Sequence, residues 1–432
     1  MRLLYNLLFP IFFVLSAPYY FWKMWRRGGW QRGFGERFGH LAADKLPGPA
    51  GSQLLWLHAV SVGEVNVCLQ LIAALRPRLP GWRFLVSTTT TTGMGELEKK
   101  LPADVARIYY PVDLPWVVRR ALAATRPSAV VLVEAEFWPN FLWQAQDLRL
   151  PLFLANARVS DRSFRGYRRA GFLFRELFGN FTAVGAQNAA DAARLRELGV
   201  RAGAVHVTGN AKFDAAAPAG CTVLDVPALL RSLAVPEDAQ LLVAGSTHAG
   251  EEVLLAQMFL RLRPRFPKLF LVLVPRHFER TKAVVEELRP TGIRLALRTE
   301  LTEGHAPAPG GVDGLLVNTT GELRHFYRHA TIVFVGKSLT ATGGQNPIEP
   351  GALGKAMVFG PHMENFRPIA AEFVAHDGAL QVPDAAALES ALATLLADPG
   401  RREQLGANAL KVVQRNQGAA LRTAEMIAAK LR

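Results

Sequence analysis

After residue 50, short apolar runs alternate with segments whose apolar residues recur at helical spacing. The apolar runs predict buried strands, and the intervening segments predict helices. In the first half of the chain the predicted strands are Leu54–Leu57, Phe84–Ser87, Ile108–Tyr110, Ala129–Val133, Leu152–Ala155 and Thr182–Ala186. This alternation is typical of an α/β protein with a parallel sheet.

The alternation breaks near the middle of the chain and then restarts. The later predicted strands are Leu241–Ala244, Leu269–Val274, Gly314–Asn318, Ile332–Val335 and Ala356–Phe359, with helices at Glu251–Arg263 and Glu279–Leu288 and a loop over residues 292–311. Because 432 residues exceed one ordinary hydrophobic core, two domains are expected. We predict Rossmann-like domains over residues 23–214 and 228–432, a linker at 215–227, and ligands in a cleft between them.

The first 22 residues differ from everything that follows. Leu3 to Trp22 is almost wholly apolar and aromatic, interrupted only by Asn6, Pro10, Ser16 and Pro18. The segment is long enough to span a bilayer, and its prolines also suit insertion in the membrane plane. No small-residue cleavage site follows, but Lys23, Arg26, Arg27, Arg32 and Arg37 do, near Trp22, Trp25 and Trp30. This flank predicts an uncleaved membrane anchor over residues 1–22 with the main body cytoplasmic, a buried core helix being the alternative.

The charge of the chain requires an anionic partner. The formal net charge is +14, which suits nucleic acid, anionic lipid or a phosphorylated substrate. The cations are not interleaved with exposed aromatic residues in a recognised nucleic-acid module, so we expect no nucleic-acid partner. Cys68 and Cys221 match no metal or redox spacing. No Walker-type loop occurs and no Gly-x-Gly-x-x-Gly follows the first strand of either half, which argues against an ATPase or a nicotinamide enzyme.

The run His58 to Val65 joins the first predicted strand to a helix through small residues. Such a turn leaves backbone N–H groups unpaired at the helix start, where they suit an anionic or hydroxyl-rich ligand. Glu64 then lies at the edge of the sheet where α/β proteins bind their ligands. From this turn alone, Glu64 can equally serve to complement the helix dipole.

Several turns in the second half also follow predicted strands. Ser246, or the threonine after it, can cap the next helix or offer a hydroxyl to a phosphate. Arg276, directly after Pro275, can pair with a phosphate or carboxylate. Lys337 and Ser338 are further candidate contacts for a phosphate or the donor.

The stretch Gly343 to Pro350 allows two interpretations. Asn346 can cap a helix that begins at Pro347, with Glu349 completing a capping box. The carboxylate of Glu349 can also accept both ribose hydroxyls of a nucleotide. The two roles are compatible.

These motifs together resemble the Kdo transferases, the 3-deoxy-D-manno-octulosonic acid transferases of lipopolysaccharide assembly. The resemblance lies in His58 to Val65, Pro275-Arg276-His277, Gly321-Glu322-Leu323 and Asn346 to Pro350, and it includes the apolar N-terminus and the segment Gly33 to Gly39. It implies a GT-B fold, in which donor CMP-Kdo binds the C-terminal domain and the lipid A precursor (lipid IVA) binds the N-terminal one.

The resemblance also implies roles for single residues. Glu64 corresponds to the proton acceptor of the family. The residues that correspond to its CMP-binding set are Pro275, Arg276, Thr320, Gly321, Glu322, Asn346, Pro347, Ile348 and Glu349. Thr320 stands where other members can carry Met. The location implied is the cell inner membrane.

The chemistry implied is attack by a sugar hydroxyl on the anomeric carbon of an activated keto-sugar, which gains from a carboxylate base. We find no Asp-x-Asp motif and expect no metal or other cofactor. The candidate acceptor contacts are Arg158, Arg162, Arg165 and Arg168, which suit a phosphorylated head group at an anionic membrane surface, or form a solvated basic face. A GT-B enzyme that uses a UDP-sugar and an epimerase of similar fold remain alternatives.

Overall fold

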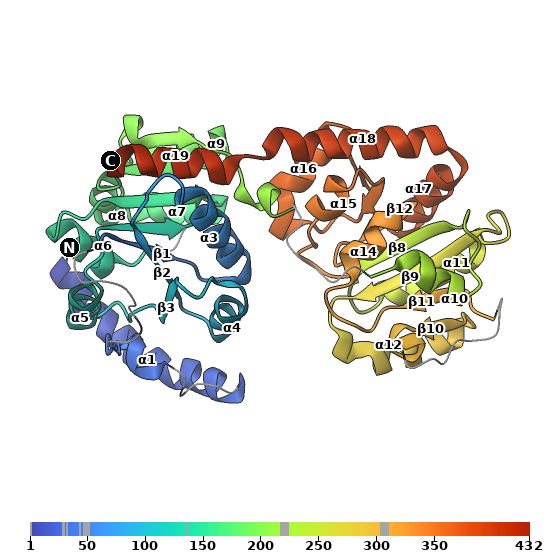
Figure 1. The fold of residues 1–432 in the computed structure, drawn as a ribbon, viewed down its shortest axis with the longest axis horizontal. Coiled ribbons are helices and arrows are strands. Elements are labelled where there is room, and N and C mark those ends of the chain that lie inside the picture. Colours follow the sequence, from blue (N-terminus) through green and yellow to red (C-terminus); the bar gives the residue numbers. More distant parts are fainter. Residues whose placement is uncertain are drawn as a thin grey trace. The chain divides into compact units, whose positions relative to one another are not determined.

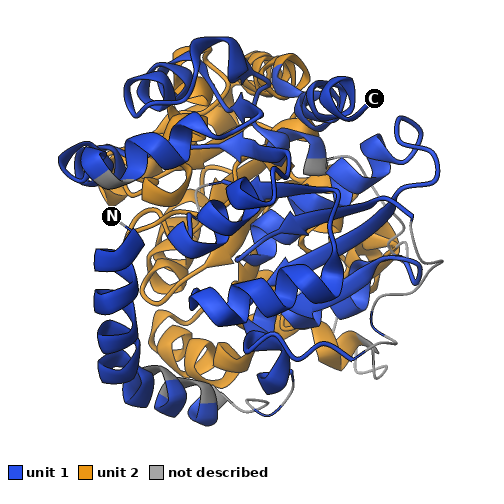
Figure 2. Ribbon diagram, turned by 90° about the vertical axis from the view of Figure 1, so that its left-hand side faces the viewer, with its two compact units in different colours: residues 1–215, 416–432 blue, residues 216–415 orange. Residues whose placement is uncertain are grey.

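The computed structural model describes residues 2–27, 31, 33–42, 45, 52–134, 137–216, 224–302 and 311–432. They form two compact units, coloured separately in Figure 2. Unit 1 comprises Met1–Ala215 and Asn416–Arg432, and unit 2 comprises Ala216–Arg415. Trp30, Arg32, Cys221 and most of the predicted linker at 215–227 lie outside the described residues, as does much of the predicted loop at 292–311.

Unit 1 is built on a seven-stranded parallel sheet with the order β3-β2-β1-β4-β5-β6-β7. Its strands are β1 (Leu54–His58), β2 (Arg83–Thr88), β3 (Ala106–Tyr109), β4 (Ala129–Val133), β5 (Leu152–Ala157), β6 (Ala183–Ala186) and β7 (Val205–Val207). Its helices are α1 (Arg2–Arg27), α2 (Phe34–Arg37), α3 (Val62–Leu75), α4 (Thr91–Lys100), α5 (Pro115–Thr125), α6 (Pro139–Asp147), α7 (Asp161–Arg169), α8 (Gly171–Gly179), α9 (Ala189–Glu197) and α19 (Ala419–Leu431), with 3-10 turns η2 (Ala202–Ala204) and η3 (Ala211–Ala216).

Both faces of this sheet are covered. Along β1 every residue is buried, and successive side chains enter different core clusters. Leu54 and Trp56 pack into one cluster, whereas Leu55 and Leu57 pack into the other. This alternation follows from the pleat of the strand and explains why the run is apolar without interruption.

Unit 2 repeats this design with the sheet order β10-β11-β9-β8-β12-β13-β14 (Figure 1). Its strands are β8 (Gln240–Thr247), β9 (Leu269–Pro275), β10 (Leu295–Leu297), β11 (Gly314–Leu316), β12 (Ile332–Val335), β13 (Met357–Phe359) and β14 (Leu380–Gln381). Its helices are α10 (Val226–Ser232), α11 (Glu251–Leu262), α12 (Thr281–Leu288), α13 (Arg298–Thr302), α14 (Leu323–His329), α15 (Ile348–Ala352), α16 (Arg367–Ala375), α17 (Ala385–Ala397) and α18 (Pro399–Asn416), with 3-10 turns η4 (Phe278–Arg280), η5 (Arg289–Thr291) and η6 (Glu364–Phe366).

The C-terminal helix differs from the sequence prediction. Residues 416–432 belong to unit 1, although they were expected in the domain 228–432. Asp214 accepts hydrogen bonds from the backbone N–H groups of Gly418 at 2.6 Å and Ala420 at 2.7 Å, which fixes the start of α19. Ile427 and four alanines of this segment join the same core cluster as Leu55. Helical periodicity indicates a buried face but does not identify the sheet that buries it.

The strands that the sequence did not indicate are short. β7, β10 and β14 each span two or three residues. β10 and α13 both lie in the segment 292–311, which was predicted as a loop. Such short strands carry too few apolar residues for an alternating pattern to emerge.

α1 holds the residues predicted as an anchor. In the described part of the chain, Arg2–Tyr19 is the one helical stretch long and apolar enough to cross a membrane, by length and composition. None of this stretch is fully buried within the protein. The alternative interpretation, a buried core helix, is therefore wrong.

Candidate functional site

Glu64 lies in the first turn of α3, directly beyond the carboxyl end of β1. Its side chain is 7% exposed. One carboxylate oxygen accepts a hydrogen bond from Ser61 Oγ at 2.8 Å, and the other accepts from the backbone N–H of Val60 at 2.8 Å. The N–H of Glu64 donates to Ser61 Oγ at 3.3 Å, so Ser61 is the N-cap of α3 and is also hydrogen-bonded to the Glu64 side chain. The structural role left open by the sequence is therefore present, and it fixes the carboxylate at the edge of the sheet.

Three further polar residues gather at the same edge, and sequence reasoning missed them. Lys212 Nζ pairs with Glu134 Oε1 at 2.9 Å. Asn156 Nδ2 donates to that same oxygen at 3.4 Å, and Asn156 Oδ1 accepts from the backbone N–H of Ala211 at 3.0 Å. A Cβ added to Gly63 would lie 4.0 Å from Lys212 Cε, which puts this cation beside the start of α3.

Backbone geometry marks two of these residues. Glu134 has φ 64° and Asn156 has φ 52°, both in the left-handed region that non-glycine residues rarely adopt. Glu134 directly follows β4, and Asn156 is the last residue but one of β5. These two strands come after β1 on one side of the sheet. Residues with a strained backbone of this kind concentrate at functional sites. The residue types of Glu134 and Asn156 do not predict the left-handed conformation.

The predicted acceptor arginines lie on or beside α7. Arg162, Arg165 and Arg168 are exposed, Arg158 is half-buried, and α7 has no buried residue. Arg168 lies over the ring of Phe164 and pairs with Glu197 at 3.6 Å. The helix is therefore a basic surface of unit 1, and its contact with an acceptor remains a prediction.

In unit 2, the buried carboxylate of Glu251 organises the carboxyl edge of the sheet. It accepts hydrogen bonds from four backbone N–H groups, those of His248 at 2.9 Å, Lys337 at 2.7 Å, Ser338 at 2.9 Å and Leu339 at 3.0 Å. The side chain is 0% exposed. One carboxylate thus joins the loop after β8 to the loop after β12.

The start of α11 differs from the sequence prediction. The N-cap of α11 is Gly250, not Ser246 or Thr247. Thr247 Oγ1 instead donates to the buried Glu252 at 3.0 Å, which also pairs with Arg280 at 3.0 Å. The acidic pair at the helix start is therefore used for tertiary contacts with neighbouring loops.

Ser246, Lys337 and Arg276 are brought together at this edge. The N–H of Arg276 donates to the carbonyl of Thr247 at 3.0 Å. A Cβ on Gly336 would lie 2.6 Å from the carbonyl oxygen of Ser246, so the two loops approach too closely for any other residue there. Ser246 and Lys337 adopt φ 55° and φ 56°. Arg276 is exposed at the end of β9.

Ser338 does not fit its predicted role. Its side chain is 0% exposed, its hydroxyl donates to the carbonyl of Val335 at 2.6 Å, and it accepts from the N–H of Gly360 at 2.9 Å. The hydroxyl is therefore used inside the protein and is not available to a donor phosphate.

Asn346 does not cap α15 as predicted, because the N-cap is Pro347 and no side chain caps the helix, but Asn346 and Glu349 still contact each other. Asn346 Oδ1 accepts from the N–H of Ile348 at 3.1 Å, and its Nδ2 donates to Glu349 Oε1 at 3.4 Å. α15 begins at Ile348, one residue later than expected. Burial raises the pKa of Glu349, against the opposing effects of Asn346, Arg324 and Arg276. Arg276 therefore lies within electrostatic reach of this carboxylate.

Thr320, Gly321 and Glu322 form the turn after β11. Thr320 and Gly321 are exposed, and Gly321 has φ 84°. The carboxylate of Glu322 is held by Arg298, with contacts of 2.9 and 3.1 Å, and by Thr319 Oγ1 at 2.7 Å. The side chain of Glu322 thus shapes the turn, which leaves the backbone of Thr320 and Gly321 accessible to a ligand.

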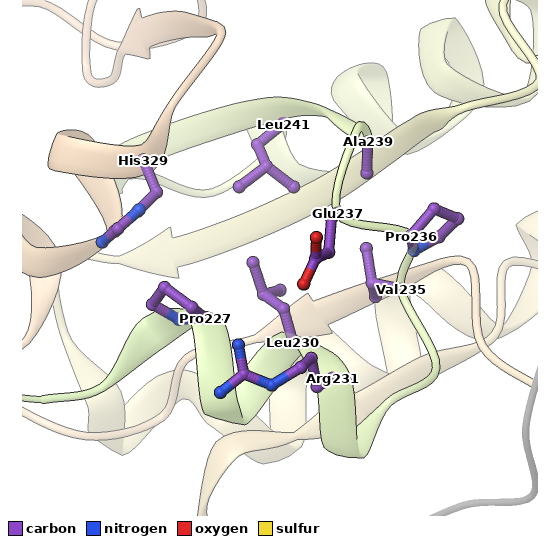
Figure 3. Close-up of a pocket in the computed structure, with 9 residues that line it drawn as sticks. All are labelled: Pro227, Leu230, Arg231, Val235, Pro236, Glu237, Ala239, Leu241 and His329. Atoms are coloured by element: carbon purple, nitrogen blue, oxygen red, sulfur yellow. The ribbon is translucent and has the colours of Figure 1, made fainter.

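Figure 3 shows a hollow elsewhere on unit 2. It is lined by residues of α10, the loop that follows it, Leu241 near the start of β8, and His329 at the end of α14. The hollow lies at the amino end of β8 and contains none of the predicted site residues. Since α/β sheets bind ligands at the carboxyl ends of their strands, we assign it no part in the site.

Among the described residues, no group of three or more His, Cys, Asp and Glu side chains is arranged to hold a metal ion. The expectation of metal independence remains a prediction.

Known proteins resemble the chain in sequence and in fold. A family model described as 3-Deoxy-D-manno-octulosonic-acid transferase (kdotransferase) matches residues 32–215. A 3-deoxy-D-manno-octulosonic acid transferase of Bordetella pertussis is 34% identical over 435 residues, which covers 95% of this chain and 96% of the relative. The protein of the same name from Haemophilus influenzae is 31% identical over 395 residues, which covers 91% and 90%.

A solved structure of UDP-GlcNAc 2-epimerase from Neisseria meningitidis bound to UDP-GlcNAc has a TM-score of 0.57 and 13% identity, and covers 88% of this chain and 99% of its own. At this identity the likeness shows the fold alone. Together with the two seven-stranded parallel sheets, it confirms the predicted GT-B architecture of two Rossmann-like units.

Proposed function

Since the chain belongs to the family of 3-deoxy-D-manno-octulosonic acid (Kdo) transferases, we propose that it moves Kdo from CMP-Kdo to lipid IVA, the lipid A precursor. The chain is a glycosyltransferase by family, so the epimerase and the nucleic-acid binder are no longer competing interpretations. The donor, the acceptor and the base are the parts of the proposal that an experiment must test.

The observation that carries the proposal is the carboxylate of Glu64, held at the carboxyl edge of the unit 1 sheet by Ser61 and Val60. A sugar hydroxyl is a poor nucleophile and needs a base within hydrogen-bond reach. In the proposed reaction Glu64 takes the hydroxyl proton while the oxygen bonds to the anomeric carbon of Kdo. The bond from that carbon to the phosphate oxygen of CMP breaks, and attack from the opposite face inverts the anomeric centre.

Unit 2 supplies groups suited to CMP. The leaving group carries one phosphate, whose charge Arg276 and Lys337 can neutralise without a divalent ion. The accessible backbone at Thr320 and Gly321 and the pair Asn346–Glu349 suit the base and the ribose hydroxyls. Since the chemistry requires no redox step, no cofactor is needed.

The acceptor explains the basic surface of unit 1. Lipid IVA is a phosphorylated lipid, and the exposed arginines of α7 suit its phosphates at the membrane surface. Lys212, which lies beside the start of α3, is a second candidate contact for the acceptor. We place the protein at the cell inner membrane, with α1 as its anchor and the two units on the cytoplasmic side.

The test is product analysis with purified full-length protein, CMP-Kdo and a tetra-acylated lipid A precursor. Mass spectrometry of the product is expected to show one or more added Kdo units and gives their number. CMP is expected to compete with the donor and UDP is not. Competition by UDP but not by CMP would identify the alternative, a GT-B enzyme with a UDP-sugar donor.

A further inference from the structure

The first turns of α1 are attached to unit 1 by specific contacts. Arg2 forms a two-point ion pair with Asp147 at the end of α6, with distances of 2.7 and 2.9 Å. Tyr5 Oη donates to Asp113 Oδ2 at 2.9 Å. Figure 1 shows this end of α1 beside α5 and α6. The anchor segment is therefore docked on the body of the enzyme at its N-terminal end.

Aromatic rings extend this docking along the helix. Tyr5 meets the edge of Trp143 with ring centroids 5.7 Å apart, and Phe9 meets Trp138 at 6.3 Å. Tyr5 packs against the core cluster of unit 1 that contains Trp143. Trp138 is the N-cap of α6 and Trp143 lies within it. Residues 2 to 9 of α1 therefore contact α6.

One face of α1 is half-buried and the opposite face is exposed. The half-buried positions are 5, 6, 9, 10, 13, 16 and 17, which recur at three to four residues and so form one stripe. The exposed large apolar residues of the helix, with exposed fractions from 42% to 88%, are Leu3, Leu4, Leu7, Leu8, Ile11, Phe12, Val14, Leu15, Tyr19, Phe21, Trp22 and Trp25.

Docking and spanning exclude each other. The stretch apolar enough to cross a membrane is Arg2–Tyr19, and its first half carries the contacts with unit 1. If this stretch crossed the membrane, Arg2 would lie roughly 27 Å from the cytoplasmic side, at 1.5 Å per residue. Unit 1, which contains Asp147 and Asp113, would stay on the cytoplasmic side, so both polar contacts would be broken.

We propose that α1 lies in the plane of one leaflet, with its half-buried stripe on unit 1 and its exposed stripe in the lipid. This inference rests on the proposed membrane anchoring and not on the proposed transfer reaction. The occupant of the exposed stripe is an anionic lipid surface. An in-plane helix inserts its apolar face to the boundary between head groups and acyl chains.

The residues around the stripe suit that occupant. Trp22, Trp25 and Tyr19 are exposed at the C-terminal end of α1, and such rings prefer the level of the head groups. Arg26 lies 4.9 Å over the ring of Trp22. The chain carries a net charge of +14, so an anionic leaflet attracts it.

A protease test distinguishes the two orientations. Full-length protein with one epitope tag at each terminus is prepared in inner-membrane vesicles of both orientations. In-plane insertion predicts that both tags are digested only when the cytoplasmic face points outward. Digestion of the N-terminal tag from the opposite side would overturn the in-plane proposal and leave membrane anchoring intact. Failure to sediment with the vesicles would overturn both.

A cross-linking test examines the docking contact itself. Arg2→Cys with Asp147→Cys, in a Cys221→Ser background, is expected to cross-link through a short bis-maleimide in protein bound to vesicles of phosphatidylethanolamine and phosphatidylglycerol. Cys68 is buried and can stay. Arg76→Cys with Asp104→Cys, which replaces an exposed 2.7 Å ion pair elsewhere on unit 1, is the positive control. Loss of the first cross-link on binding, while the control persists, would contradict docking.

The exposed stripe is tested by charge. Leu7→Glu with Leu15→Glu is expected to weaken binding to the same vesicles by about tenfold or more, because two apolar side chains leave the lipid. Val374→Glu, at a 40% exposed apolar position of unit 2, is the matched control and is expected to bind normally. Equal binding by all three proteins would overturn the proposal. A different result would identify a second copy of the chain as the occupant of the exposed stripe. In that case the wild-type protein forms dimers, the two substitutions dissociate them, and vesicle binding does not change.

Discussion

Ser61 and Glu64 hold each other at the start of α3. Ser61 Oγ donates to the carboxylate of Glu64 at 2.8 Å and accepts from its N–H at 3.3 Å. A residue proposed as the catalytic base therefore also stabilises the helix that presents it. Loss of activity on mutation is informative only if the two roles are separated.

Glu64→Gln separates them. The oxygen of a glutamine amide can still accept from the N–H of Val60 and its nitrogen can donate to Ser61 Oγ, so the helix start should survive, but an amide cannot accept the proton of the acceptor hydroxyl. We expect transfer to fall by about 10²–10⁴-fold, the usual contribution of a general base, with the melting temperature and the affinity for CMP nearly unchanged. Steady-state kinetics, thermal unfolding and calorimetry measure the three quantities. Near-normal turnover would remove Glu64 from the mechanism, whereas Glu64→Ala should lower both activity and stability.

Arg276→Ala should weaken CMP binding by about 10- to 100-fold, because a charge-assisted hydrogen bond contributes roughly 1.5–3 kcal/mol. Isothermal calorimetry with CMP measures this change. Arg261→Ala is the control, since Arg261 pairs with Glu389 at 2.7 Å on an exposed surface of unit 2 and should bind CMP normally. Equal affinities for both variants would place Arg276 outside the donor site.

Glu251→Ala should disorder the loops after β8 and β12, although Glu251 itself is not among the residues proposed to contact the donor. Four backbone N–H groups lose their common acceptor, including that of Lys337, so we expect a higher KM for the donor together with lower stability of unit 2. A donor KM that stays normal in folded protein would show that the loops keep their shape without this carboxylate. Glu389→Ala, which leaves these loops intact, is the matched control.

His58 makes unit 1 sensitive to acid. The ring stacks on Tyr110 at 3.8 Å, and burial lowers the pKa of His58 to about 3. Below pH 6.5 the unfolded chain binds a proton that the native state does not, so stability falls as the pH falls from 6.5 towards 3. Between pH 7 and pH 5 we expect a loss of about 2 kcal/mol from this residue.

His58→Phe should remove that part of the pH dependence. Ser87 Oγ, which lies 2.9 Å from His58 Nδ1, still accepts from Trp56 Nε1 at 2.7 Å in the variant. All eight tryptophans precede residue 144, so their fluorescence during urea unfolding reports unit 1 alone. A pH dependence identical to that of the wild type would contradict the assignment.

Chelation tests the expected metal independence. We expect Kdo transfer to proceed at an unchanged rate in excess EDTA, because Arg276 and Lys337 are cations suited to a single phosphate. The rate with and without added Mg²⁺ is the measurement. Loss of activity that Mg²⁺ restores would make the donor site metal-dependent.

Much of the fold follows from the sequence because central strands of a parallel sheet are buried on both faces and read as apolar runs. β1, β4 and β9 illustrate this, since every residue in them is buried and His58, at the end of β1, is their one polar residue. The edge strands β7 and β14 are partly exposed and too short to produce such a run. The unit to which α19 belongs depends on tertiary packing alone.

The places of the candidate residues were predicted where a motif follows a strand, and their functional roles stay predictions. Glu64 and Arg276 lie just beyond the carboxyl ends of β1 and β9, whereas Glu349 lies in α15. Ser338 follows a strand equally closely, yet its hydroxyl turns inward. Glu134, which follows β4 with a left-handed backbone conformation, carries no local sequence signal.

The return of α19 to unit 1 imposes an order on folding during synthesis. Unit 2 is a continuous segment that leaves the ribosome complete, whereas the core cluster of unit 1 still lacks Ala424 and Ile427. The N–H groups that donate hydrogen bonds to Asp214 are synthesised more than two hundred residues after it. The sheet beside Glu64 thus becomes fully covered only after unit 2 has been synthesised, so a chain that ends before residue 416 contains all of unit 2 but lacks part of the core of unit 1.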